Sequence, residues 1–231
     1  MALGCNELID EVKAAIGRDT DTVLVTDARV LRWLNKAQEE IAEQCAGLTA
    51  LDIKNTTSVD FTEVLSYALS DFTSSLDDIT TANRICHIYS AYYLDGADSI
   101  RLQFMPLDDF DGEYPDPTHS DFSPDKPKYY TRRGGNLETY PLCSTANADT
   151  DFRLDGSVYP VDFTASDSTA LSSLDHADDL LIAYAVFKAW AYIGKAEPAQ
   201  LWLSKFNGLL EDYKRRNDVL HEWDANLYGV Y

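Results

Sequence analysis

The two ends of the chain carry the hydrophobic periodicity of helices, and the long segment between them does not. Residues 6–46 predict two helices, because apolar side chains recur there at three- and four-residue spacing. Residues 175–217 predict two more. The residues between are rich in Thr, Tyr, Asp, Ser, Gly and Pro, which favour strands and turns. This layout predicts an α+β fold, in which the N- and C-terminal helix pairs form one helical bundle and the β-rich middle is an insertion.

The same layout predicts the domain organisation. We expect residues 1–50 and 170–217 to form a discontinuous helical bundle, residues 51–169 a β-rich inserted subdomain, and residues 218–231 a C-terminal docking tail. A chain of 231 residues is long enough to bury such a core. Because an inserted subdomain projects from its bundle, and projections commonly contact something, the layout favours an assembly component over an enzyme.

Apolar stripes and cap residues define the predicted helices. Gly17 and Gly194 should follow the ends of the first and third helices, and Thr26 or Asp27 should cap the second. Pro198 suits the first turn of the fourth helix. The following residues should be largely buried in the bundle: Leu31, Leu34, Ile41, Leu181, Tyr184 and Leu209.

Turn dipeptides punctuate the middle of the chain, at residues 95–96, 111–112 and 155–156, each of them Asp-Gly. Between the turns, the sequence predicts strands over residues 84–93 and 99–105, a hairpin over 128–142 around Gly134-Gly135-Asn136, and a second hairpin that pairs 152–154 with 158–163. Residues 107–125 contain seven acidic and no basic side chains, together with three prolines, and therefore predict an exposed loop.

The net charge of −20 is concentrated in this middle, where residues 51–174 carry 21 acidic and 8 basic side chains. An acidic surface repels phosphate backbones, so binding that wraps DNA or RNA is disfavoured. Two interpretations stay open: the charge serves solubility alone, or it lines a surface along which nucleic acid passes without sticking.

Motifs for catalysis, cofactor binding and metal binding are missing from the sequence. It has no nucleophile-elbow, dinucleotide, P-loop or zinc-protease motif, and no cysteine pair at zinc spacing. His87, His119, His176 and His221 are isolated and predict structural or solvated roles. The acidic residues 108–116 lack the order of a calcium-binding loop. We therefore predict no catalytic residue, no cofactor and no metal site. The four cysteines predict thiols, and neither a secretory signal nor an apolar run of about 18 residues, the length that spans a membrane, is present.

Several short segments resemble a known family. They are Arg32-Trp33-Leu34-Asn35-Lys36-Ala37, Pro127-Lys128-Tyr129-Tyr130, Asn136-Leu137-Glu138-Thr139-Tyr140-Pro141 and Phe152-Arg153-Leu154-Asp155-Gly156, followed by a closing helix pair that contains Tyr184, Tyr192 and Trp202. In this order they resemble the head-to-tail connector proteins of tailed bacteriophages, the portal adaptors of the neck.

The resemblance implies a structural virion protein of the neck region, made in the host cytoplasm. Copies of such an adaptor form a ring, typically of twelve, between the portal protein of the head and the tail or nozzle proteins. The helical bundle builds the ring, and the C-terminal tails reach the portal. DNA passes through the ring channel without specific binding, and no membrane is involved. The resemblance implies no enzymatic activity.

The C-terminal segment supplies the predicted partner interface. Lys214, Arg215 and Arg216 form the densest basic cluster of the acidic chain, and Trp223, Tyr228 and Tyr231 follow them. Arginine and aromatic residues are favoured interface anchors. We expect residues 214–231 to lack fixed structure until a partner orders them. The alternative is that the fourth helix continues and its aromatic residues pack against the chain itself.

Two other functions remain open from the sequence. The acidic, tyrosine-rich middle could be a glycan- or ligand-binding module. A carboxylate-dependent glycan hydrolase would need a defined pair of carboxylates at fixed separation, and the sequence selects no such pair.

Overall fold

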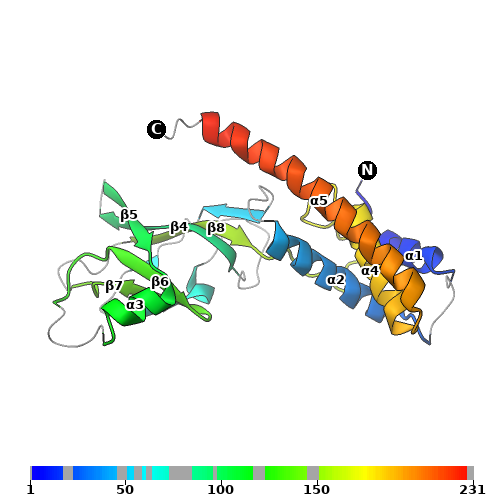
Figure 1. The fold of residues 1–231 in the computed structure, drawn as a ribbon, viewed down its shortest axis with the longest axis horizontal. Coiled ribbons are helices and arrows are strands. Elements are labelled where there is room, and N and C mark those ends of the chain that lie inside the picture. The colour runs from blue at the N-terminus through cyan, green and yellow to red at the C-terminus, as the bar shows by residue number, and fades with distance from the viewer. Residues whose placement is uncertain are drawn as a thin grey trace. The chain divides into compact units, whose positions relative to one another are not determined.

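The computed structural model describes residues 2–17, 23–45, 51–54, 59–60, 64–72, 85–95, 98–116, 123–144 and 151–227, with side chains on the last helix up to residue 217. The chain divides into two compact units (Figure 1). A helical unit comprises Met1–Leu51 and Tyr159–Tyr231, and a β-rich unit comprises Asp52–Val158. The predicted α+β fold, with helices from both ends and a β-rich insertion, is confirmed.

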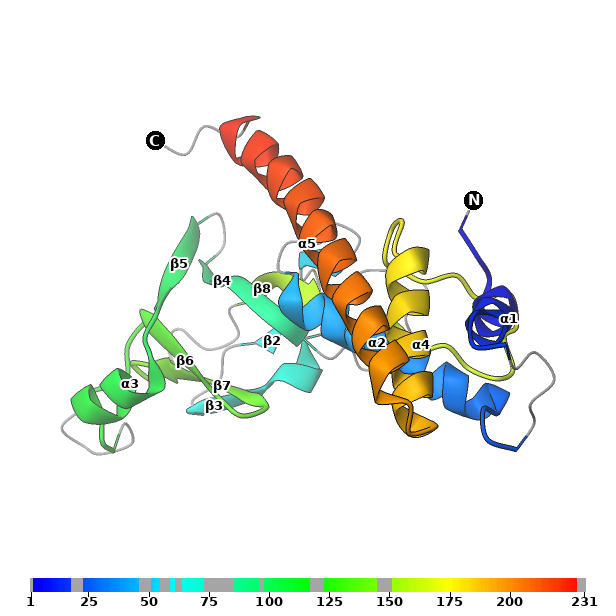
Figure 2. The ribbon, with the colours of Figure 1, turned by 45° about the vertical axis from the view of Figure 1, so that its right-hand side comes forward.

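The helical unit is organised around its most apolar helix. Its helices are α1 (Cys5–Ala15), α2 (Asp27–Gln44), α4 (Asp178–Tyr192) and α5 (Ala196–Leu227). Helix α4 packs against the other three, and in Figure 2 it lies beside α5 with α2 behind. Most of the side chains of α4 are apolar, and its buried residues are Leu180, Leu181, Ala183, Tyr184, Ala185, Val186 and Ala189. A helix that is apolar on nearly all sides belongs in the centre of a bundle, because every face of it then contacts another helix.

Most of the predicted bundle core is buried. Leu34, Ile41 and Leu181 are fully buried and Tyr184 nearly so. Leu31 and Leu209 are only half-buried, so the prediction was wrong for them. Each lies at the edge of its apolar stripe and lines a surface pocket.

The helix ends follow the predicted cap residues. The hydroxyl of Thr26 accepts a hydrogen bond from the backbone N–H of Arg29, at 3.3 Å. Gly17 and Gly194 each follow a helix end with φ of +66° and +79°, a region that glycine adopts without a Cβ clash. Helix α5 begins at Ala196 and places Pro198 in its first turn.

Helix α5 is longer than the sequence predicted. We expected the fourth helix to end at residue 217 and residues 214–231 to lack fixed structure, but α5 continues to Leu227. Between residues 209 and 227 the sequence has no glycine or proline to end a helix, and it contains many good helix formers. The alternative of a continuing helix is therefore confirmed up to Leu227, whereas residues 228–231 lie outside the described part.

The β-rich unit is a single sheet of eight strands in the part of the chain that the structure describes. The strands are β1 (Asp52–Lys54), β2 (Val59–Asp60), β3 (Ser66–Ala68), β4 (Ile85–Asp95), β5 (Asp98–Phe104), β6 (Tyr129–Arg133), β7 (Asn136–Tyr140) and β8 (Asp151–Val158), with a short 3₁₀ turn η2 (Leu69–Asp71). Their order is β1-β8-β4-β5-β6-β7-β3, and β2 also pairs with β8. All pairs are antiparallel except β5 with β6.

One face of this sheet carries an apolar core. The fully buried side chains of Tyr93, Phe72 and Phe152 lie at its centre, and the Phe72 and Phe152 rings meet edge to face with centroids 5.0 Å apart. The predicted β6–β7 hairpin is confirmed, with Arg133 paired to Asn136 across Gly134-Gly135. Gly134 has φ of +61°, which the two-residue turn requires.

The predicted second hairpin does not form. Strand β8 runs straight through Asp155-Gly156 and pairs with both β4 and β1. A Cβ on Gly156 would lie 2.2 Å from the carbonyl oxygen of His87. The glycine is therefore needed for a close approach of two backbones, beside an irregular stretch of β4, and not for a turn.

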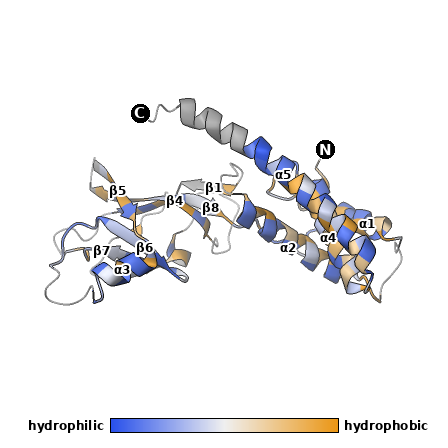
Figure 3. Cartoon of the chain, viewed as in Figure 1, coloured by the Kyte–Doolittle hydropathy of each residue, from blue (hydrophilic) through white to orange (hydrophobic). Residues whose placement is uncertain are grey.

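The predicted exposed loop at residues 107–125 begins instead with a helix, α3 (Leu107–Glu113). Its apolar residue Phe110 is fully buried against the sheet, and its Asp-Gly pair at 111–112 lies inside the helix. Arg133 joins α3 to the hairpin, because it contacts Asp111 at 3.3 Å and Glu138 at 2.9 Å. In Figure 3, α3 is mostly blue, consistent with a helix that buries one apolar side chain and exposes its carboxylates.

Candidate partner-binding site

The predicted basic cluster lies on α5, where the helix separates its three cations. Successive helical residues point about 100° apart, so Lys214, Arg215 and Arg216 cannot face one surface together. Lys214 is half-buried and contacts Gln44 of α2 at 3.3 Å and Glu211 at 3.2 Å. Lys214 therefore joins α5 to the end of α2.

The two arginines face solvent. Arg215 pairs with Asp212 at 2.8 Å, one turn earlier on the same helix. The Arg216 guanidinium lies 5.8 Å from the ring centroid of Tyr213. Both side chains are exposed, so both are accessible to a partner.

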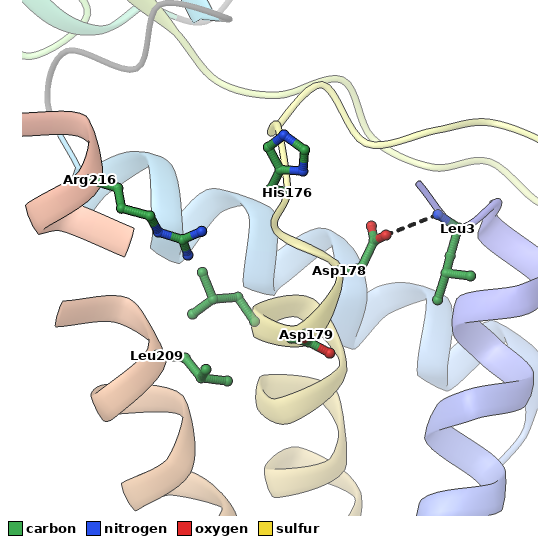
Figure 4. Close-up of a pocket in the computed structure, with 7 residues that line it drawn as sticks. Leu3, His176, Asp178, Asp179, Leu209 and Arg216 are labelled. Atoms are coloured by element: carbon green, nitrogen blue, oxygen red, sulfur yellow. Dashed lines mark hydrogen bonds between the residues drawn. The ribbon is translucent and has the colours of Figure 1, made fainter. Parts of the chain in front are cut away.

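Arg216 also lines a pocket at the beginning of α4 (Figure 4). The pocket has a volume of about 470 Å³, and its lining residues are Leu3, His176, Asp178, Asp179, Leu180, Leu209 and Arg216. The Leu3 N–H donates to Asp178 at 3.0 Å, which ties the N-terminal segment to α4. The pocket thus presents a guanidinium, an imidazole and two carboxylates beside the side chains of three leucines.

His176 has the unusual backbone conformation at this pocket. Its φ is +55°, a region that non-glycine residues rarely adopt. The side chain is exposed at the turn that leads into α4 (Figure 4). The sequence predicted a structural or solvated role for His176. The hydrophobic periodicity of the sequence gave no indication that His176 and Arg216 would line the same pocket.

The aromatic members of the predicted interface are described only in part. Trp223 lies within α5, although its side chain is not among those described. Tyr228 and Tyr231 lie outside the described residues. The interface role of these residues, and of the three basic ones, stays a prediction.

Two amide side chains of α2 have a structural role that the sequence did not reveal. The Asn35 amide donates to the Phe163 carbonyl at 3.0 Å and accepts from the Phe163 N–H at 2.9 Å. Gln38 donates to the Val161 carbonyl at 3.1 Å. Together they fix residues 161–163, which follow the β-rich unit in the chain. Their side-chain amides bond to the backbone groups of this segment as a neighbouring strand otherwise would. The only sign of this role in the sequence was the i, i+3 spacing of the two amide residues beside the apolar stripe of α2.

No groups of metal-binding side chains were found among the described residues. The four cysteines are buried thiols. Within the part of the chain that the structure describes, no helix is both long and apolar enough to cross a membrane.

Comparison with known families decides the identity. A family model described as SU10 adaptor protein matches residues 5–226, from the first residue of α1 almost to the end of α5. The chain belongs to the SU10 adaptor protein family. This match confirms the resemblance to phage adaptors, and it covers both the helical unit and the β-rich unit. No curated protein matches the chain.

Proposed function

We propose that this member of the adaptor family is a subunit of the ring that joins the portal of a phage head to the tail. Twelve copies would surround the DNA channel in the neck of the virion, with the portal protein on one side and tail or nozzle proteins on the other. Family membership over residues 5–226 supports an adaptor role, and the form of α5 supports the contact with the portal.

The observation that carries the portal contact is the overhang of α5. A helix rises about 1.5 Å per residue, so α5, with 32 residues, is about 48 Å long, whereas α4, with 15 residues, is about 22 Å long. The buried described residues of α5 end at Tyr213. The helix beyond Tyr213 carries Arg215, Arg216 and Trp223 and extends past the helix on which it packs, as a docking element would.

The negative net charge of the chain supports a role in a channel through which DNA passes. A chain of net charge −20 gives a twelve-membered ring a formal charge of about −240, and negative walls repel phosphates. Duplex DNA would therefore slide through such a ring without specific binding, whereas a basic wall would hold it.

Deletion of residues 218–231 tests the portal contact. We expect the thermal midpoint of the truncated chain to stay close to that of the full chain, because the last described buried side chain is Tyr213. Attachment to the portal protein of the same phage, measured by sedimentation velocity and electron microscopy, should be lost. Arg215→Glu with Arg216→Glu should weaken attachment, and Lys195→Glu, at the exposed turn before α5, is the matched control.

A truncated chain that still decorates the portal at full occupancy would contradict the docking role of α5. A truncated chain that unfolds would place the segment in the core of the helical unit instead.

A further inference from the structure

Apolar side chains are exposed together at the end of the helical unit where α2 begins and α4 ends. Val23 is 77% exposed, Leu24 43% and Tyr192 50%. Trp33 is half-buried beside them. We call Val23, Leu24, Arg29, Trp33 and Tyr192 the end patch. Exposed apolar side chains that lie next to one another favour an interaction site, whereas single scattered ones are ordinary on protein surfaces.

The end patch is held in a fixed arrangement. The Arg29 guanidinium lies 4.5 Å above the Tyr192 ring, and Arg29 donates to the Leu24 carbonyl at 2.6 Å. The Trp33 and Tyr192 ring centroids are 6.0 Å apart. One arginine thus joins a loop, α2 and α4 into one surface. Its Arg29, Trp33 and Tyr192 are of the three residue types that are enriched in interface hot spots.

Basic side chains lie beside this patch, although the chain is strongly acidic. Arg29, Arg32 and Lys36 follow one another at i, i+3 and i+7 along α2, with Arg29 half-buried and the other two exposed. Lys36 pairs with Glu39 at 3.0 Å, whereas no ion pair is found for Arg32 among the described residues. The patch therefore suits a partner surface with exposed carboxylates.

The same unit presents such a surface on α1. Asp10, Glu11, Ala14 and Ala15 are all exposed on its solvent face. Neither carboxylate forms an ion pair with any residue that the structure describes. The two carboxylates can form ion pairs with Arg32 of a neighbouring copy. The two alanine methyl groups beside them can make apolar contacts with its Tyr192 and Leu24.

We propose that the end patch and the basic row of α2 in one copy dock on the acidic face of α1 in the next copy. The proposal rests on the ring of the proposed function and names the surfaces that build it. Two different surfaces of one subunit that meet head to tail form a heterologous contact, and such a contact builds a ring when the rotation from copy to copy closes. Both surfaces belong to the helical unit.

Charge-swapped full-length variants test the contact. The first variant, Arg32→Glu with Lys36→Glu, makes the row along α2 acidic, and the second, Asp10→Lys with Glu11→Lys, makes the exposed face of α1 basic. Each alone should associate at least about tenfold more weakly than the wild type, because like charges face one another. The four-fold variant, with both surfaces swapped, should recover wild-type association, and an equimolar mixture of the first and second variants should form mixed assemblies that neither forms alone.

Association is measured by analytical ultracentrifugation, at high protein concentration without the portal and again with it. Tyr192→Ser, which changes no charge, should also weaken association, and circular dichroism confirms that each variant is folded. If both single-surface variants assemble like the wild type, or if neither the four-fold variant nor the mixture recovers assembly, the proposal is wrong. If the charge-swapped variants lose portal binding but keep copy–copy association, the end patch binds the portal instead, and the proposal is equally wrong. A wild-type chain that associates with its own copies but never with the portal would instead refute the proposed function.

Discussion

At the scale of single residues, the structure assigns several side chains to purposes that their local sequence does not show. Gly156 looks like half of a turn and is instead the point where β8 and β4 approach most closely. Asn35 lies in the segment that resembles phage adaptors, and its amide holds the return segment at Phe163. In both cases the decisive partner is more than 60 residues away in sequence.

Gly156→Ala should therefore lower the free energy of unfolding by about 3 kcal/mol, because the new methyl group would overlap the His87 carbonyl unless the backbones separate. Gly208→Ala is the matched control: apart from the local backbone of its own helix, nothing lies within 4 Å of its Cβ position, and alanine should stabilise α5 by about 1 kcal/mol. Urea unfolding of both variants measures the difference. Equal midpoints for the two would show that the β8–β4 approach is looser than described.

Burial raises the pKa of Tyr213 to about 12, with further upward effects from Cys45 and Asp175. The folded chain then keeps this proton at pH values where the unfolded chain loses it, so the contribution of Tyr213 is complete below about pH 10 and falls away as the pH rises toward 12. Tyr213→Phe should flatten the loss of stability between these values, as followed by thermal unfolding at stepped pH. An unchanged alkaline slope would mean that Tyr213 does not contribute to this dependence.

At the scale of elements, helices that carry periodic apolar stripes were predictable, and elements stabilised by distant contacts were not. Cap residues such as Thr26 and Gly17 mark helix ends locally. Helix α3 has only seven residues and is surrounded in sequence by acidic and proline residues, so its formation depends on Phe110 beneath it and Arg133 beside it. An isolated helix of that length is not stable in water.

Leu34→Ala should lower the free energy of unfolding by about 3 kcal/mol, because this side chain is fully buried in the stripe of α2. Leu31→Ala, on the half-buried edge of the same helix, should cost about 1 kcal/mol, because less apolar area is lost there. Chemical denaturation of the pair compares the two positions at constant helix propensity. Similar losses for both would count against the described orientation of α2.

At the scale of the whole molecule, the two ends of the inserted β-rich segment lie next to each other. Its first strand, β1, pairs antiparallel with its last strand, β8, and Asp52 lies opposite Ser157. An insertion whose two ends are adjacent can be removed without stretching the chain at the junction. The domain boundaries predicted from the sequence stay a proposal. It states that the helical bundle and the inserted subdomain fold independently of each other.

Replacement of residues 52–158 by a short glycine linker should therefore leave the helical unit folded. We expect cooperative thermal unfolding and the full helical circular dichroism signal per helical residue, because α1, α2 and α5 each pack on α4 within that unit. The same replacement combined with Leu34→Ala is the control, which should unfold at lower temperature. A non-cooperative, largely unfolded product would show that the helical unit depends on the inserted one.

The sequence by itself determined what depends on neighbours along the chain: the two helix pairs, their caps, the β6–β7 hairpin and, through an ordered set of short segments, the adaptor family. The tertiary structure decided what depends on contacts between distant residues. It placed Gly156 in a strand, formed α3 beside Arg133 of the hairpin, and gathered Arg29, Trp33 and Tyr192 into one patch. The physical reason is range: capping and amphipathic periodicity act within a few residues, whereas close backbone approach, burial and charge pairing exist only once the chain has folded.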